Sequence, residues 1–289
     1  DVVIGVAESN GRTTLVGAGS ELESKAGKAG GALLGLLSQG PGHAIDQVTE
    51  LNLPGLRVLA VGIGADLDLQ PEDLRRAAGL GVRRALRADA AGQRRIVISL
   101  DAGTDAQVQA VAEGALLAAD GFRKLTHRPA PPAIESIGIV GSSRSSQQAL
   151  ATARVTALAV CTARDWTNLP ANLLGPNDLA EQARGYLKDT RVEIEVLDER
   201  ALEKAGYGGI LAVGAGSARP PRLLRLDYRP RGANRHLVLI GQGITYDSGG
   251  YNLKPPESLK TMKCDMAGAA SVIVATRAIA DLGLSVRVT

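Results

Sequence analysis

Short apolar runs alternate with amphipathic stretches along the first half of the chain. The apolar runs hold consecutive Val, Ile, Leu and Ala residues bounded by glycine or charged residues, which is typical of buried strands. They lie at residues 2–7, 57–64, 95–100 and 136–140. Between them, a proline and two acids at 71–73 open a predicted helix that runs to about Leu86, and Thr104 and Asp105 cap a second helix that runs to about Phe122. Strands that alternate with helices predict βαβ units and a largely parallel sheet.

A proline-rich segment divides the chain. Three of the four residues 129–132 are prolines, which fit neither a helix interior nor a central strand. We therefore predict an N-terminal α/β domain at residues 1–132. One strand and a long Ala-rich helix at 143–165 then form a connecting segment, 133–165, and a second domain occupies residues 166–289.

The second domain continues the alternation of strands and helices. Residues 192–196 alternate between apolar and charged positions, which predicts a strand with one exposed face or a strand at an edge. The other predicted strands lie at 222–227, 236–240 and 285–289, and the predicted helices at 177–187, 198–205 and 266–280. The expected fold class is α/β, with two domains that each hold a mostly parallel sheet flanked by helices.

Composition and charge exclude several classes of protein. The 289 residues suffice for two domains, 45% of them are hydrophobic, and no apolar run is as long as a membrane span. The net charge is +3 with acids and bases interspersed, so nucleic acid is not expected as a partner. The two cysteines, Cys161 and Cys264, lack the spacing of metal ligands and predict a reduced, cytoplasmic protein.

The predicted strand at 236–240 leads into a glycine-rich segment that carries the candidate chemistry. Asp247, Lys254 and Asp265 lie in or just after this segment, ahead of the helix at 266–280. Ligands gather at the carboxyl ends of parallel strands, where glycines let the backbone approach them closely. Spacing alone nevertheless favours simpler roles, with Asp265 as the N-cap of the following helix and Lys254 as a surface lysine.

The sequences GQGITYDSGGYNLKP at 241–255 and MKCDMAGAASV at 262–272 closely resemble the signature of the leucine aminopeptidase (cytosol aminopeptidase) family of dinuclear metallo-exopeptidases. The acids, the lysine and the glycines all fall in register with that signature. Residues 163–183 and 212–230 extend the resemblance upstream, whereas the first half of the chain matches only loosely.

The resemblance implies a role for each of these side chains. Asp247 would bridge two metal ions and Asp265 would bind one of them, since carboxylate oxygens suit divalent cations. Lys254 would polarise the scissile carbonyl and stabilise charge on the tetrahedral intermediate. Met262 would line the pocket for the first side chain of the substrate, although packing in the core is an equally good interpretation of that residue.

The activity that the resemblance implies is release of N-terminal, leucine-like residues from peptides. A water held between two divalent metal ions, manganese, zinc or magnesium, would attack the carbonyl. The family forms homohexamers, so a homo-oligomer is implied, with peptides as substrates and no membrane partner.

Two departures from the family pattern qualify these expectations. The family has a metal-binding lysine where this chain has Gln242, a weaker ligand, so one metal site should be weakened. The family also supplies an Asp, a Glu and a catalytic Arg from a segment that would follow Thr289, so the resemblance implies a truncated chain with an incomplete catalytic domain.

Two alternatives to a competent peptidase stay open. One is a non-catalytic homologue or fragment that keeps the fold as a scaffold or binding protein, which the glutamine at position 242 favours. The other is nucleic-acid binding, which a basic isoelectric point permits without indicating any surface for it.

Overall fold

The computed structural model describes residues 1–9, 12–16, 44–53, 55–64, 69–87, 93–122, 125, 133–141 and 146–289. The chain divides into two compact units, Asp1–Ala157 and Leu158–Thr289. The proline-rich segment at 129–132 that divides the predicted domains lies outside the described residues. Within the described ranges, no helix combines the length and the apolar character that crossing a membrane requires.

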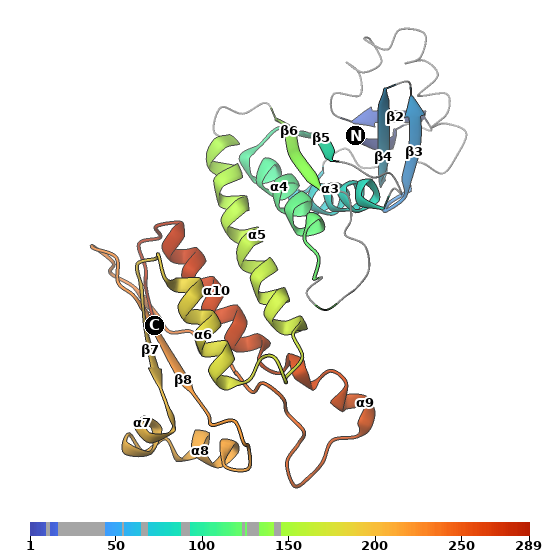
Figure 1. The fold of residues 1–289 in the computed structure, drawn as a ribbon. Helices are drawn as coiled ribbons and strands as arrows, with labels where there is room; N and C mark the ends of the chain where they lie inside the picture. The colour runs from blue at the N-terminus through green and yellow to red at the C-terminus, as the bar shows by residue number, and fades with distance from the viewer. Residues whose placement is uncertain are drawn as a thin grey trace. The chain divides into compact units, whose positions relative to one another are not determined.

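Among the described residues, unit 1 holds a six-stranded sheet whose central strands are parallel (Figure 1). β1 (Val2–Ser9) lies between β4 (Leu56–Gly64) and β5 (Arg94–Ala102), and β6 (Ile134–Gly141) follows β5. All three pairings are parallel. The buried runs read from the sequence are therefore confirmed as strands, in the direction that the alternation with helices predicts.

Two further strands, not predicted from the sequence, join this sheet in antiparallel pairings. β2 (Arg12–Val16) pairs with β1 beyond the point where β5 leaves it, and β3 (Val48–Leu53) pairs along β4. Both are short and mix polar with apolar residues, so neither forms the continuous apolar run that marks a buried strand.

The two helices predicted for the first half of the chain are confirmed. α3 (Pro71–Leu86) and α4 (Asp105–Ala119) pack against each other and against the sheet, and Thr104 caps α4 by accepting a backbone hydrogen bond in its first turn. The helices approach so closely that a Cβ atom on Gly114 would lie 2.0 Å from the carbonyl oxygen of Arg75. Only glycine fits at this contact.

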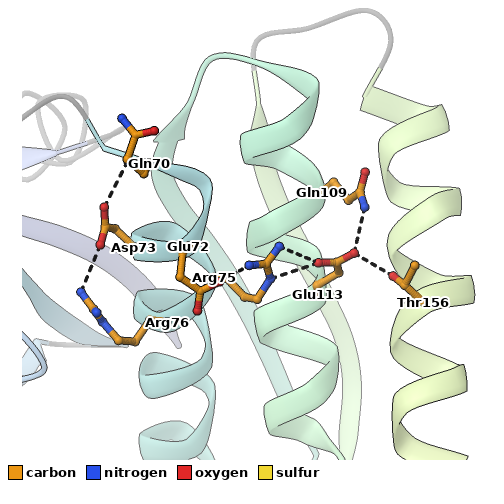
Figure 2. A network of polar contacts seen from close by, with 8 residues as sticks. All are labelled: Gln70, Glu72, Asp73, Arg75, Arg76, Gln109, Glu113 and Thr156. Atoms are coloured by element: carbon orange, nitrogen blue, oxygen red, sulfur yellow. Dashed lines mark hydrogen bonds and ion pairs between the residues drawn. The ribbon is translucent and has the colours of Figure 1, made fainter. Parts of the chain in front are cut away.

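A buried carboxylate joins these helices to the long helix α5 (Ser146–Asn168). Glu113 accepts hydrogen bonds from Arg75 Nε at 3.0 Å, from Gln109 at 2.9 Å and from the hydroxyl of Thr156 in α5 at 2.7 Å (Figure 2). Burial alone would raise the pKa of Glu113, but these hydrogen bonds and the charge of Arg75 outweigh it and lower the pKa. The ionised carboxylate therefore holds α3, α4 and the first part of α5 together.

Unit 2 is built on a sheet in the order β7-β8-β10-β9. The strands are β7 (Val192–Leu197), β8 (Leu223–Tyr228), β9 (His236–Leu237) and β10 (Arg287–Val288). α6 (Pro176–Leu187) and α10 (Ala267–Asp281) lie against this sheet, as Figure 1 shows. Their apolar faces and the end of α5 share one core, which buries Trp166, Leu179, Ala183, Ile273 and Val288. The α/β class with two sheets flanked by helices is thus confirmed.

The strand directions in unit 2 differ from the expected mostly parallel sheet. β7 pairs antiparallel with β8 and β8 pairs antiparallel with β10, so only β10 and β9 are parallel. α7 (Glu199–Lys204) and α8 (Gly208–Gly214) lie beyond one end of β7 and β8 in Figure 1. The chain therefore turns back at that end instead of crossing over the sheet, which gives an antiparallel neighbour. β7 lies at an edge, as its alternating pattern predicts.

β9 is shorter than the predicted strand at 236–240. Only His236–Leu237 pairs as a strand, and Val238 and Ile240 are exposed. The backbone N–H of Leu239 still donates to the carbonyl oxygen of Thr289, after which the chain leaves the sheet. The strand is therefore shorter than the apolar run that predicted it.

Candidate active site

The candidate residues form one connected set in the segment between β9 and α10. Lys254 contacts both Asp247 and Met262, and Gln242 contacts Asp265. The 3-10 helix η1 (Met262–Cys264) joins these two groups, because the backbone N–H of Asp265 donates to the carbonyl oxygen of Met262. All five side chains therefore lie in one neighbourhood within unit 2.

Asp247 is held from two directions. Its Oδ1 accepts a hydrogen bond from the backbone N–H of Gly249 at 2.8 Å, and its Oδ2 accepts one from the ammonium of Lys254 at 2.6 Å. Gly249 and Gly250 have φ values of 91° and 70°, a left-handed conformation that favours glycine. The hydrogen bond from Lys254, followed by that from Gly249, lowers the pKa of Asp247 and keeps the carboxylate ionised.

Lys254 is half-buried and paired, unlike a freely solvated surface lysine. Besides its contact with Asp247, its Nζ lies 2.9 Å from the Sδ of Met262, and its backbone N–H donates to the carbonyl oxygen of Ser248. An ammonium has three N–H donors, and the described contacts use two of them. The third is not used by these two contacts.

Asp265 does not cap the helix that follows it, so the interpretation favoured by spacing alone is wrong. α10 begins at Ala267, and its N-cap position is occupied by Met266, whose side chain makes no capping bond. Asp265 ends η1 with helical backbone angles, whereas an N-cap residue is usually extended. The tight turn ahead of α10 leaves the Asp265 carboxylate facing Gln242.

Gln242 joins the exit of the sheet to α10. Its Nε2 donates to Oδ2 of Asp265 at 2.6 Å, and its backbone carbonyl oxygen accepts from the backbone N–H of Ala269 at 2.8 Å. A Cβ atom on Gly241 would lie 2.4 Å from the carbonyl oxygen of Gly268, so glycine permits this approach. The direct contact between the two segments places Gln242 and Asp265 side by side.

The second half of this chain and most of the first half match a known family. Residues 161–289 match the cytosol aminopeptidase family, catalytic domain, and residues 43–129 match the cytosol aminopeptidase family, N-terminal domain. The chain belongs to the cytosol aminopeptidase family. The segment with the five candidate residues lies wholly within the part that matches the catalytic domain.

Relatives of similar sequence carry the same family name. The probable cytosol aminopeptidase of Cutibacterium acnes is 42% identical over 294 residues, which cover 100% of this chain and 57% of that protein. The probable cytosol aminopeptidase of Streptomyces coelicolor is 40% identical over 316 residues, with 100% and 60% covered. The structure of the bottromycin maturation enzyme BotP in complex with Mn matches this chain with a TM-score of 0.76 at 30% identity. The match covers 100% of this chain and 58% of the BotP chain. The chain thus spans less than two thirds of the length of these relatives.

A cytosol aminopeptidase is a metallopeptidase, so the donors that this site offers decide whether it fits divalent ions. Asp247 and Asp265 supply carboxylate oxygens, and Gln242 has an amide oxygen. Within the described ranges, no group of three or more His, Cys, Asp and Glu side chains is arranged to hold a metal ion. A divalent ion takes about four to six donors. The described residues of this family member therefore supply part of a donor set and do not fit a complete two-metal centre.

No sequence pattern pointed to two residues that hold this site against α5. Nζ of Lys263 donates to the carbonyl oxygen of Asn168, the last residue of α5, at 2.7 Å. The Sγ of Cys264 lies 3.7 Å from the carbonyl oxygen of Thr167. These partners are far apart in the chain, so periodicity gives no signal for them. A lysine that donates to the last carbonyl groups of a helix far away in the sequence can be recognised only from the folded structure.

Proposed function

We propose that this chain carries part of the active site of a metal-dependent aminopeptidase that releases N-terminal, leucine-like residues from peptides. The observation that carries the proposal is the contact set of Asp247, Lys254, Met262, Gln242 and Asp265 within the part that matches the family's catalytic domain. Two carboxylates, an ammonium and an apolar thioether in one place are groups that hydrolysis of an amide next to an apolar side chain can use.

Each side chain has one task in this proposal. Asp247 and Asp265 are ligands for divalent ions, and Lys254 directs its remaining N–H toward the scissile carbonyl oxygen, where negative charge develops. A pair of such ions, when bound, would supply a hydroxide from water at neutral pH. Met262 contributes apolar surface for the leucine-like side chain.

Gln242 needs a separate account. Its Nε2, and not its amide oxygen, is directed at Asp265, so the amide has to turn before its oxygen can act as a ligand. A neutral amide oxygen is also a weaker donor than a deprotonated amine. One of the two metal positions is therefore weaker than the other.

The metal, the assembly and the compartment are carried over from the family. Manganese, zinc and magnesium are the candidate ions, and manganese is the first to test because the related BotP structure is a complex with Mn. A homohexamer in the cytoplasm, acting on peptides, is the proposed assembly. Sedimentation of the 29.9 kDa chain tests it, and a mass that stays at one chain over a wide concentration range would contradict it.

A non-catalytic family member is the second candidate, and one contact favours it. The amide of Gln242 donates to Asp265 at 2.6 Å and so occupies a carboxylate oxygen that a metal ion would need. Such a chain would keep the fold as a scaffold or binding protein.

Hydrolysis of leucine p-nitroanilide, with and without added Mn²⁺, separates these two candidates. Metal-dependent turnover, with faster cleavage of the leucine than of the glutamate anilide, is expected for the aminopeptidase. Absence of turnover at saturating Mn²⁺, together with no bound manganese after dialysis, would contradict an active site in this chain and support the second candidate, a non-catalytic homologue or fragment.

A further inference from the structure

We propose that Lys263 is a positioning residue, which ties η1 to the C-terminal end of α5 and thereby holds Met262 and Asp265 in place. The importance of these two residues for catalysis rests on the proposed aminopeptidase function. The tie itself rests only on the contacts of Lys263 and its neighbour Cys264.

The end of α5 is a favourable partner for a lysine. The last carbonyl groups of a helix have no partner further along it and carry a partial negative charge. Nζ of the half-buried Lys263 donates to one of them, that of Asn168, at 2.7 Å. The contact of Cys264 with the carbonyl oxygen of Thr167 brings a second residue of η1 against the same turn.

The two elements joined in this way differ in how firmly they are held. α5 ends in the core of unit 2, where Trp166 is 3% exposed and packs edge-on against Tyr186, with 5.6 Å between the ring centroids. η1 has three residues and none of them is buried. A single 3-10 turn with no buried residue is held only weakly by its own contacts. The hydrogen bond from Lys263 to Asn168 therefore fixes the position of η1 against the end of α5.

Lys263 stands between the two halves of the site. The residue before it, Met262, contacts Lys254 through its Sδ, and Asp265, two residues after it, accepts the hydrogen bond from Gln242. A displacement of η1 would change both contacts at once. Errors of about 1 Å in the placement of reacting groups can cost roughly 10²-fold in rate, so a residue that never touches substrate can still affect turnover.

Three variants of the 289-residue chain test the tie. Lys263→Met keeps the length of the side chain and removes its charge and donors, whereas Lys263→Arg keeps both. Lys260→Met is the matched control, because Lys260 lies on the same segment, is exposed and pairs with Glu257. Lys263→Gln, which keeps a neutral donor, replaces the methionine variant if the latter does not fold.

The first readout is the rate at which iodoacetamide labels Cys264, measured by peptide mass spectrometry with Cys161 of α5 as internal reference. Loss of the tie should speed labelling roughly fivefold in Lys263→Met, as a local opening made about 1 kcal/mol easier would. The rate of the parent chain is expected for Lys263→Arg and Lys260→Met. An unchanged rate in Lys263→Met, or an equal rise in Lys260→Met, would overturn the inference.

The second readout is turnover of leucine p-nitroanilide. Lys263→Met should lower kcat about tenfold or more with a smaller change in KM, because Met262 and Asp265 are then misplaced. Lys263→Arg keeps the charge and the donors and should therefore retain the parental kcat. Faster labelling with unchanged kcat would overturn the positioning role. A parent chain without turnover would count against the proposed function, while the labelling of Cys264 would still decide whether Lys263 holds η1.

Discussion

Single side chains determine how much charge the candidate site can stabilise. Nζ of Lys254 lies 2.6 Å from Oδ2 of Asp247 and 2.9 Å from the Sδ of Met262, between an anion and an apolar group. Solvent screens a half-buried ammonium less than an exposed one, so it interacts more strongly with charge that develops beside it. This geometry supports the role proposed for Lys254 as a donor to an oxyanion.

Replacing Lys254 by methionine should lower kcat for leucine p-nitroanilide by about 10²–10³-fold, the usual cost of removing one donor to an oxyanion. KM should change less, because the lost interaction forms mainly in the transition state. Steady-state kinetics at saturating Mn²⁺ measure both constants. Lys260→Met removes the same charge from a neighbouring exposed position and should retain parental kinetics. A Lys254→Met variant with parental kcat would exclude the proposed role of this lysine.

Gln242 is the residue whose change should strengthen the site. Gln242→Lys removes the amide that donates to Asp265 and offers an amine, which binds a divalent ion more strongly once it is deprotonated. We expect the Kd for Mn²⁺ to fall about tenfold, equivalent to roughly 1.4 kcal/mol, with a larger gain at higher pH. Equilibrium dialysis measures the affinity. Gln182→Lys, on the exposed face of α6, controls for the added charge, and equal affinities in the two variants would show that position 242 does not bind metal.

Among the described elements, α3 and α4 leave no room for added atoms where they cross. Their backbones meet at Gly114, where added atoms would overlap the carbonyl group of Arg75. The same crossing places Arg75 beside Glu113, so close backbone packing and the ion pair depend on each other. A shift of either helix would open both contacts.

Gly114→Ala should therefore destabilise unit 1 by about 1–3 kcal/mol, the usual cost of forcing extra atoms into a close-packed contact. Urea denaturation followed by circular dichroism gives the change in unfolding free energy. Gly138→Ala in β6 is the control, because its Cβ atom would meet its nearest neighbour at 3.9 Å, an ordinary contact. Equal midpoints for the two variants would contradict the close packing described at Gly114.

At the scale of the whole molecule, the sequence predicts those elements whose own residues decide their form. The runs of β1, β4 and β5 and the bounds of α3 could be read directly, because buried strands and capped helices leave local patterns. The direction of β7 and β8 could not, since it depends on α7 and α8 turning the chain back at one end of the sheet.

The candidate site likewise has residues that local sequence reveals and residues whose position depends on the folded chain. Asp247 and Lys254 stand out because an acid and a lysine flank a glycine turn, and the resemblance to the family adds their expected roles. The place of Asp265 depended on a 3-10 turn that shifts the start of α10 by a residue, which spacing does not reveal. The tie from Lys263 to Asn168 spans 95 residues and exists only in the folded chain.

The stability of the folded chain should fall in acid partly because of Glu113. The pKa of this buried carboxyl is lowered in the folded state by its partners, so the folded state binds fewer protons than the unfolded state. Its contribution to stability is therefore complete above the pKa of an ordinary glutamate, about 4.3, and is lost as the pH falls through the lower folded value.

Glu113→Gln tests this sign directly. The variant should be less stable than the parent at neutral pH, because Arg75 loses its charged partner, and its unfolding free energy should depend less on pH below about 4. Urea midpoints between about pH 7 and pH 3 measure both effects. Glu135→Gln removes an exposed carboxylate of the same unit, which pairs with Arg95, and controls for the loss of one charge. A Glu113→Gln profile parallel to that of the parent throughout this range would mean that the carboxylate titrates alike in the folded and unfolded chain.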